Sequence, residues 1–479
     1  EQTSGPVPEG GDWGGIILRA DSDWQPSDSV ALDTLRPFLN SINHAVIEYA
    51  GGEVEVDSEV KAFSAIQLED ARPSLGFNQI LRSASNAIAA TPNSFLEANG
   101  RAGPQLSGNT LRMNSTNGLF LTIRTEYGVP LDTLDVAARF ASTEVTYVLQ
   151  ENLVLAGGQG SYFKDGSGTI RSRNSGRLTV DPGVVVKLQN ARVELERGAA
   201  QLIAEGQPTQ RVVFTNLADN RFGAGGTFDT NGNLPNGYGP GRWGGIILNA
   251  GSQASIDNAF ISGGGGEVPI EGVLDQFNVI EVHQGDLRLA NSRLQSNADG
   301  VALTDRTARG ANEAATIFVR GAQPVIVGND FRDNAGATIS INANSMTDRF
   351  LADPGRQSGL ISRNAAYDDN IGPLIRDNRI SYATSEPIVV GYDEPALPPP
   401  AELPTDGSVQ QIDWNGQRVD VLTNSWVVRA SGDHAGPISF AAGWTAVDIG
   451  AGFYEVTAPG ASVNDVVAWA AGTATVSYE

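Results

Sequence analysis

The feature that most constrains this chain is a six-residue segment that occurs twice. Residues 13–18 and residues 243–248 both read Trp-Gly-Gly-Ile-Ile-Leu. A second pair of similar segments follows in the same order, residues 42–54 and residues 256–268, and each ends in Gly-Gly-Glu-Val. Self-similarity of this kind marks a repeat protein, in which equivalent segments stack on one another. The chain therefore contains two diverged copies of one unit.

A shorter pattern recurs inside both copies. Alternating apolar residues are followed by a polar turn residue at a fixed place and then by another apolar position. The turn residue is Asn78, Asn109, Asn329 or Asn378, and a degenerate version has Ser292 there. Runs of three to five residues with period two, separated by turns rich in Asn and Gly, predict β-strands.

Repetition in register predicts that each strand stacks in parallel on its equivalent one coil earlier. The inward-facing apolar residues then form continuous columns, which we expect to include Leu75, Leu106, Ile326 and Ile375. The recurrent Asn suits the turn between two sheets, because it tolerates the left-handed conformation and can hydrogen-bond to the Asn of the next coil.

The expected fold is therefore mostly β: a right-handed parallel β-helix followed by a small α+β module. Strands are expected at residues 425–429, 452–456 and 474–478 of that module, with a helix at 462–470 that Ser462 caps. We divide the chain into a first repeat copy, linking coils with a long Gly/Asn loop, a second copy, a Pro-rich linker and the module. Their bounds are 1–125, 126–240, 241–391, 392–410 and 411–479.

Composition excludes several classes of partner. The formal net charge of −23 disfavours nucleic acid and anionic membranes as partners, because there is no basic surface to replace phosphate counterions. No apolar run approaches the roughly 18–20 residues of a membrane helix, so we expect no membrane insertion. The chain has no Cys, which excludes disulfides, Cys-ligated zinc and thiol catalysis.

No catalytic set is visible, and we expect the protein not to be an enzyme. Many right-handed β-helices act on polysaccharides, which requires clustered acid and base groups. Asp368-Asp369 is the only adjacent acid pair in the second copy, and we interpret it as a pair of solvated loop carboxylates. The three histidines, His44, His283 and His434, lie in three different regions and their spacing predicts neither a triad nor a zinc site.

Calcium is the only cofactor that the sequence suggests. Asp229, Asn231 and Asn233 place oxygen ligands at alternating positions, as at the start of a calcium loop. The Gly at the sixth place and the Glu at the twelfth are missing, since Leu234 and Pro240 stand there. A plain Gly/Asn loop is therefore the preferred interpretation.

Several stretches resemble the right-handed β-helix regions of very large, repetitive secreted proteins of bacteria, Planctomycetes in particular. These stretches are the two Trp-Gly-Gly-Ile-Ile-Leu segments and residues 178–188, 198–215 and 320–327. The resemblance implies an extracellular or cell-surface location, with any signal peptide removed or upstream. It supplies no catalytic residues.

The C-terminal module resembles the prodomain of subtilisin-type proteases. The matching residues are 426–429, 452–456, 463–470 and 475–479. In that family a protease domain would follow, whereas this chain stops. The resemblance implies a role in docking or in assisting folding.

These observations predict an extracellular structural or adhesive surface protein. The strand at Trp13 has no coil before it, so we expect its edge to be covered by a neighbouring copy, by the C-terminal module or by residues of a longer precursor. We favour a fibre subunit that stacks head to tail. The alternative is a secreted protein that binds or degrades polysaccharide. The expected partners are accordingly the chain itself, another surface protein or an extracellular polysaccharide.

Overall fold

The computed structural model describes two compact units, residues 1–157 with 174–392 and residues 158–173 with 393–479. The parts of the chain that it describes are residues 7–19, 40–56, 58–97, 101–126, 129–158, 163–164, 170–171, 175–223, 230, 237, 239–270, 272–300, 312–346, 372–391, 409–414, 417–422, 425–430, 445–450, 453–457 and 476–478.

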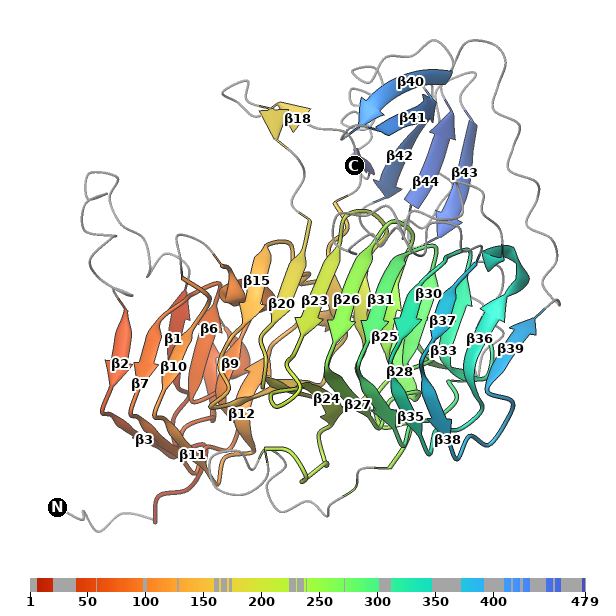
Figure 1. Ribbon diagram of the computed structural model, residues 1–479. Coiled ribbons are helices and arrows are strands. Elements are labelled where there is room, and N and C mark those ends of the chain that lie inside the picture. Colours follow the sequence, from red (N-terminus) through yellow and green to blue (C-terminus); the bar gives the residue numbers. More distant parts are fainter. Residues whose placement is uncertain are drawn as a thin grey trace. The chain divides into compact units, whose positions relative to one another are not determined.

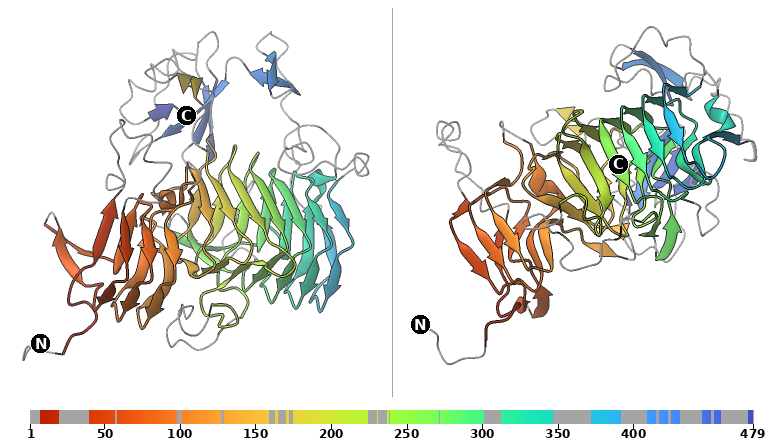
Figure 2. Two further views of the ribbon diagram at one scale, coloured as in Figure 1. Left: turned by 60° about the vertical axis from the view of Figure 1, so that its left-hand side comes forward. Right: turned by 60° about the horizontal axis from the view of Figure 1, so that its bottom comes forward.

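The first unit consists of stacked coils of three strands each, and its long sheets are parallel (Figures 1 and 2), an arrangement that fits a parallel β-helix. From residue 137 onward, the first strands form one seven-stranded sheet: β15 (Ala137–Phe140), β20 (Arg177–Val180), β23 (Gln201–Glu205), β26 (Gln253–Asp257), β31 (Asp286–Ala290), β34 (Val325–Val327) and β37 (Leu374–Arg376). The third strands form another: β17 (Leu153–Leu155), β22 (Val193–Leu195), β25 (Ile246–Leu248), β30 (Ile280–His283), β33 (Ala315–Arg320), β36 (Ala337–Asn342) and β39 (Ile388–Gly391).

The coils before residue 125 have their own first and second faces. The first is the sheet of β2 (Ser41–Asn43), β7 (Ser74–Gly76) and β10 (Gln105–Ser107). The second is the sheet of β3 (Val46–Glu48), β8 (Gln79–Leu81) and β11 (Thr110–Arg112).

One sheet of eleven strands runs through the whole unit, and it corrects the expectation that each strand stacks on its sequence equivalent. It begins with the third strands of the first copy, β1 (Ile16–Arg19), β6 (Ile66–Glu69), β9 (Asn86–Ala90) and β12 (Thr116–Leu121). It continues with the second strands of the later coils, β16 (Thr146–Leu149), β21 (Val185–Leu188), β24 (Val212–Asn216), β27 (Ala259–Ser262), β32 (Arg293–Gln295), β35 (Asp330–Arg332) and β38 (Arg379–Ser381). Equivalent strands stack within each half, but between β12 and β16 the stacking shifts by one face.

An aromatic cluster packs at this joint between the halves. Phe95 ends the 3₁₀ helix η3 (Pro92–Phe95), and its ring lies edge-on to Phe140 with centroids 4.8 Å apart. The ring of Tyr147 stacks on Phe140 at 4.3 Å. Burial raises the pKa of Tyr147 well above its ordinary range, although its hydroxyl oxygen accepts a hydrogen bond from the Ser142 N–H. Large side chains thus pack at the interrupted faces, next to an isolated antiparallel bridge between Leu96 and Ala138.

The predicted apolar columns are confirmed. Leu75, Leu106 and Ile326 are buried in the core, and Ile375 packs against it. They occupy equivalent places, because Leu75 pairs with Leu106 in one half and Ile326 with Ile375 in the other. Truncating such a side chain to Ala typically costs about 2–5 kcal/mol.

The corners between strands use the recurrent Asn in a way that differs from the prediction in one respect. The residue before the Asn adopts the left-handed conformation, with φ of 54° at Phe77 and 57° at Asp377, whereas the Asn follows it. The predicted contact between coils is confirmed: the Nδ2 of Asn78 donates to the Oδ1 of Asn109 at 3.0 Å. The Nδ2 of Asn329 donates likewise to Asn378 at 3.0 Å.

The duplication is visible in equivalent hydrogen bonds. The indole Nε1 of Trp13 donates to the carbonyl of Glu48 at 2.8 Å, and that of Trp243 donates to the carbonyl of Ser262 at 2.9 Å. An antiparallel hairpin follows in each copy, β4 (Glu53–Val56) with β5 (Glu59–Ala62) and β28 (Glu267–Ile270) with β29 (Val273–Gln276). A third hairpin, β13 (Thr125–Glu126) with β14 (Val129–Pro130), lies at the joint, and η6 (Ala343–Ser345) follows β36.

The described part of the second unit is antiparallel. It contains the hairpins β18 (Phe163–Lys164) with β19 (Ile170–Arg171) and β40 (Val409–Trp414) with β41 (Gln417–Leu422). Its four-stranded sheet has the order β43 (Thr445–Gly450), β44 (Phe453–Thr457), β42 (Ser425–Ala430) and β45 (Val476–Tyr478). The strands predicted at 425–429, 452–456 and 474–478 are therefore present, whereas the predicted helix lies outside the described residues.

Replacing Asn329 by Ala should destabilise the first unit by about 2–4 kcal/mol, because a buried carbonyl and a buried N–H lose their partners. The Nδ2 of Asn329 donates to the carbonyl of Leu289 at 2.9 Å, and its Oδ1 accepts from the N–H of Ser292 at 2.9 Å. The midpoint of denaturant unfolding measures this loss. Asn43→Ala at an exposed place is the control, and equal effects of the two substitutions would contradict a role for the ladder.

Candidate functional site

The strand that follows the hairpin in each copy carries polar side chains on its outward face. This strand is β30 in the second copy, where Ile280 and Val282 belong to the core and Glu281 and His283 alternate with them. It is β6 in the first copy, with Gln67 and Glu69 at the places of Glu281 and His283, 214 positions earlier in both cases. The duplicated unit therefore presents the same outward face twice.

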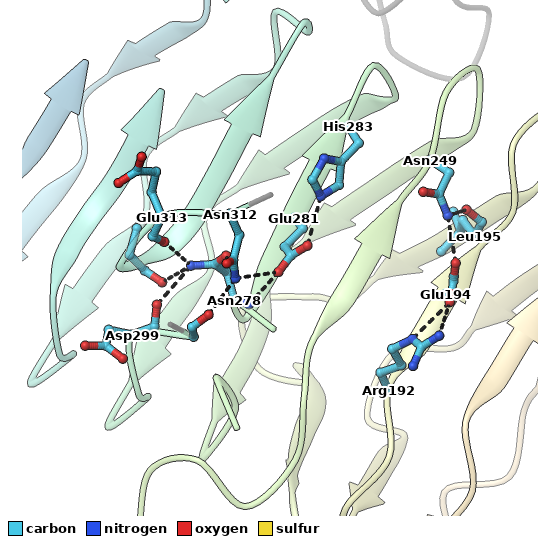
Figure 3. Close-up of polar contacts among 12 residues, drawn as sticks. Arg192, Glu194, Leu195, Asn249, Asn278, Glu281, His283, Asp299, Asn312 and Glu313 are labelled. Carbon is cyan, nitrogen blue, oxygen red and sulfur yellow. Dashed lines mark hydrogen bonds and ion pairs between the residues drawn. The ribbon is translucent and has the colours of Figure 1, made fainter. Parts of the chain in front are cut away.

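In the second copy these side chains belong to a hydrogen-bonded polar cluster (Figure 3). The Glu281 carboxylate is fully buried, and its Oε2 lies 2.9 Å from the Nε2 of His283. Its Oε1 accepts from the N–H of Asn278 at 2.8 Å and from the Nδ2 of Asn312 at 3.2 Å. Charge-assisted bonds of this kind offset much of the cost of burying a carboxylate.

Asn278 ties this cluster to the neighbouring coil. Its Nδ2 donates to the carbonyls of Asp299, Glu313 and Ala315 at 2.6–2.9 Å. Its Oδ1 accepts from Asn312 at 3.0 Å. The amide is thus fully used, and we interpret the cluster as a structural network that fixes the loop ends beside β30.

A second carboxylate, the partly buried Glu194, lies on the same outward face two coils earlier. It pairs with Ile247 across the sheet, and Ile247 pairs with Glu281. Burial acts to raise the pKa of Glu194, but the Arg192 guanidinium 2.5 Å away and the Asn249 amide more than offset this and hold it below the ordinary value. Arg192 also packs over the ring of Phe277 at 4.8 Å.

In the first copy the equivalent face opens into a cleft of about 520 Å³ at the joint between the halves. Its floor comes from successive coils: Glu69 on β6, Thr91 after β9 and Thr122 after β12. The N–H of Thr91 donates to the carbonyl of Leu68 at 3.0 Å, so the parallel ladder continues beneath the cleft. The remaining lining residues are Gln67, Asp70, Pro92, Asn93, Arg124, Leu131, Asp132, Thr133 and Asp135.

Hydrogen bonds and ion pairs hold most of the cleft carboxylates in place. The Thr91 hydroxyl donates to Asp70 at 2.6 Å, and Arg19 pairs with Glu69 at 2.9 Å. Asp132 accepts from the Nε of Arg124 at 3.0 Å and from its backbone N–H at 2.8 Å. This pairing with Arg124 holds the pKa of Asp132 below its ordinary value against the opposing effect of partial burial.

Gln67 differs from the other polar residues of the cleft. It is only 8% exposed, yet its side-chain amide has no hydrogen-bond partner within the described ranges. Its amide atoms are not among the buried unpartnered atoms of the described residues, so they lie at the surface of the cleft while the rest of the side chain is buried. The amide is therefore held in place by packing and is free to hydrogen-bond to a ligand.

The candidate sites predicted from the sequence fall elsewhere. Asp229, Asn231 and Asn233 lie outside the described residues, and so do Asp368, Asp369 and His434. His44 occupies a corner with φ of 55°, as its equivalent Asn258 does with φ of 46°. Among the described residues no group of three or more His, Asp or Glu side chains could hold a metal ion.

The sequence analysis missed the cleft. The repeat alignment gave one usable signal, because Gln67 and Glu69 stand where the second copy has Glu281 and His283. The opposite wall gave none, since it lies at the joint, where the two copies do not stack in register. It consists of Thr122, Arg124, Leu131, Asp132, Thr133 and Asp135.

Comparison with known proteins finds no matching protein-family model, curated protein or solved structure. Within the described part of the chain, no helix has the length and apolar character needed to cross a membrane.

Replacing Arg124 by Met should raise the pKa of Asp132 toward its ordinary value, because the carboxylate loses its cationic partner. The pair stabilises the folded chain at neutral pH, and this contribution is lost as the pH falls through the lowered pKa of Asp132. Carboxyl-detected NMR titration measures the change. Arg19→Met, which removes the partner of Glu69 instead, should leave the Asp132 titration in place, and an equal shift in both variants would contradict the assignment.

Proposed function

We propose that this chain is an extracellular structural or adhesive surface protein, a self-assembling fibre subunit built on a right-handed parallel β-helix. Right-handed crossovers between parallel strands are by far the commoner kind, which supports the handedness. The observation that carries the proposal is the state of the two ends of the first unit, where strand edges and the ends of the core columns stand open.

At the C-terminal end, β37, β38 and β39 are the last strands of their sheets, and no other described strand pairs with their outer edges. Their inward residues Ile375, Ile380 and Val390 pack on the core but are only partly buried. Ile388, also inward by its pairing with Ile339, is 44% exposed. The apolar columns thus end on surface that a further coil would cover.

The N-terminal end is stepped. β1 is the third strand of a coil that comes before the coil of β2 and β3. Among the described strands this first coil has no first or second strand, whereas β25 of the second copy is preceded by both, β23 and β24. Ile16, Leu18 and Ile42 are again only partly buried there. A partner that docks at this end would add one strand to the first face, beside β2, and one to the second face, beside β3.

A second copy of the chain offers such strands, because β37 and β38 are of the first and second type. In that arrangement β39 of one copy and β1 of the next would occupy the same position on the third face. One of these two strands must therefore move aside when the copies stack. Contact between the two different ends is heterologous, and it produces a filament when it does not close into a ring. Another surface protein with the same coil geometry could occupy the same end.

The extracellular location belongs to the proposal. It is supported by the resemblance of the coils to those of very large secreted bacterial proteins. An acidic chain with a net charge of −23 also suits a protein that stays soluble outside the cell.

The full-length chain should associate increasingly with concentration, and Tyr382→Asp should weaken this association by about tenfold. Tyr382 is 78% exposed at the last corner of the second face, with φ of 57°. Asp tolerates this conformation, so the fold is retained while a charge enters the end surface. Sedimentation velocity and electron microscopy measure the assemblies.

Met113→Asp is the matched control, because Met113 is 60% exposed at the same kind of corner, with φ of 59°, away from the C-terminal end. It should leave the association unchanged. A chain that stays monomeric at every concentration, or equal weakening by the two substitutions, would refute assembly through this end.

The second candidate function, binding of extracellular polysaccharide, is favoured by the cleft of the first copy. Most of its lining residues carry hydroxyl, amide or carboxylate groups, the groups that hydrogen-bond to sugar hydroxyls. This function is compatible with the first, since an adhesive fibre needs a ligand site on each subunit.

A further inference from the structure

We propose that the cleft around Gln67 binds a neutral oligosaccharide, a short stretch of a hexose polymer without acidic groups. The inference rests on the adhesive part of the proposed function. It names the class of ligand and the residue that recognises it, Gln67. It does not depend on assembly.

The unpartnered amide of Gln67, at the surface of the cleft on an otherwise buried side chain, is the observation that points to a ligand. The side chain is more than nine-tenths buried, has no partner within the described ranges and lines the cleft. An amide carries two donor hydrogens and an acceptor oxygen. A matching ligand therefore offers hydrogen-bond acceptors and donors close to one another. A sugar hydroxyl is such a group, because it donates one hydrogen bond and accepts others.

The floor of the cleft repeats along the coil axis. Glu69, Thr91 and Thr122 stand on three successive coils, as the bonds from the Thr91 and Thr122 N–H groups to the carbonyls of Leu68 and Ala90 show. Coils in a parallel sheet are about 4.8 Å apart. This spacing is close to the length of one sugar ring, so successive rings of an extended chain can meet equivalent polar groups.

The walls supply fixed acceptors. Asp70 is held by Thr91, and Asp132 is held by the side chain and the backbone of Arg124. The Asp132 carboxylate already accepts from the backbone N–H, the Nε and the Nη2 of Arg124. Asp70 accepts from Thr91 and keeps lone pairs free, so it can accept from a sugar hydroxyl without further ordering. The apolar surface of Pro92 and the half-exposed Leu131 lies beside these groups.

Charge selects a neutral ligand. The lining contains four carboxylates, Glu69, Asp70, Asp132 and Asp135, and one guanidinium, that of Arg124. A second guanidinium, that of Arg19, pairs with Glu69. The carboxylates still outnumber these two cations, and the remaining negative charge repels uronates and sulfated sugars. A bare divalent cation is disfavoured too, because no three acidic or His side chains of the described residues come together as a metal site.

The test is calorimetric titration of the full chain with neutral hexose hexamers (β-1,4-glucose, β-1,4-mannose and α-1,4-glucose), with oligogalacturonate and with calcium chloride. We expect the wild type to bind at least one neutral hexamer. Gln67→Met, which keeps the shape and removes the amide, should weaken that binding by at least about tenfold. Its thermal stability should be unchanged or higher, because the amide has no partner to lose in the free protein. Gln79→Met, on an exposed strand position of the neighbouring sheet, should bind as the wild type does.

The inference is overturned if no neutral hexamer binds, if Gln67→Met binds as tightly as the wild type, or if only oligogalacturonate or calcium binds. Sedimentation of the same samples separates the two proposals. Assembly without sugar binding refutes the cleft ligand and leaves the fibre intact, whereas binding by a strictly monomeric chain refutes the fibre and leaves the cleft.

Discussion

The first unit depends on how its chain leaves one sheet and enters the next. A coil of three short strands needs a sharp corner every few residues, and a corner turns backbone N–H and carbonyl groups away from the ladder. One residue in the left-handed conformation makes the bend, and the side chain of the Asn after it pairs with backbone groups of the preceding coil. The Nδ2 of Asn78 donates to the carbonyl of Ile42 and its Oδ1 accepts from the N–H of Ala45, while the Oδ1 of Asn109 accepts from the N–H of Asn78. Because each Asn hydrogen-bonds to the Asn of the next coil, the bonds that hold a corner also hold two coils in register. That register places the apolar side chains of successive coils on top of one another in columns.

The joint between the halves shows what happens when this alignment is interrupted. The two copies each stack in register, yet β12 pairs with a strand of a different face, β16. Phe95, Phe140 and Tyr147 fill the gap that the other two faces leave. The 3₁₀ helix and the residues on either side of the β13–β14 hairpin line the cleft. The cleft therefore forms where the two copies do not join in register. The second copy, in register with its neighbours, has a hydrogen-bonded network around Glu281 at the equivalent place.

Much of the coil architecture could be predicted from the sequence, because its signals are local and repeated. Period-two runs marked the strands, and the recurrent Asn marked the corners, although the left-handed residue is the one before it. The shift of faces could not be predicted, since no residue pattern records which strand lies on which across a joint. The cleft was missed for the same reason. Gln67 alternates with apolar residues like any solvated strand residue, and only the fold shows that it is buried.

The continuous eleven-stranded sheet also has a mechanical meaning. Backbone hydrogen bonds cross the joint on this sheet, and on the first face the antiparallel bridge between Leu96 and Ala138 and the bond from the Glu97 N–H to the Ala137 carbonyl cross it too. Tension along the coil axis is therefore carried across the joint by backbone hydrogen bonds on two faces, with the rings of Phe95 and Phe140 packed beside them. Because Pro92 and Asn93 of the 3₁₀ helix line the cleft a few residues before this bridge, the same bonds that carry the load also hold the cleft wall in place.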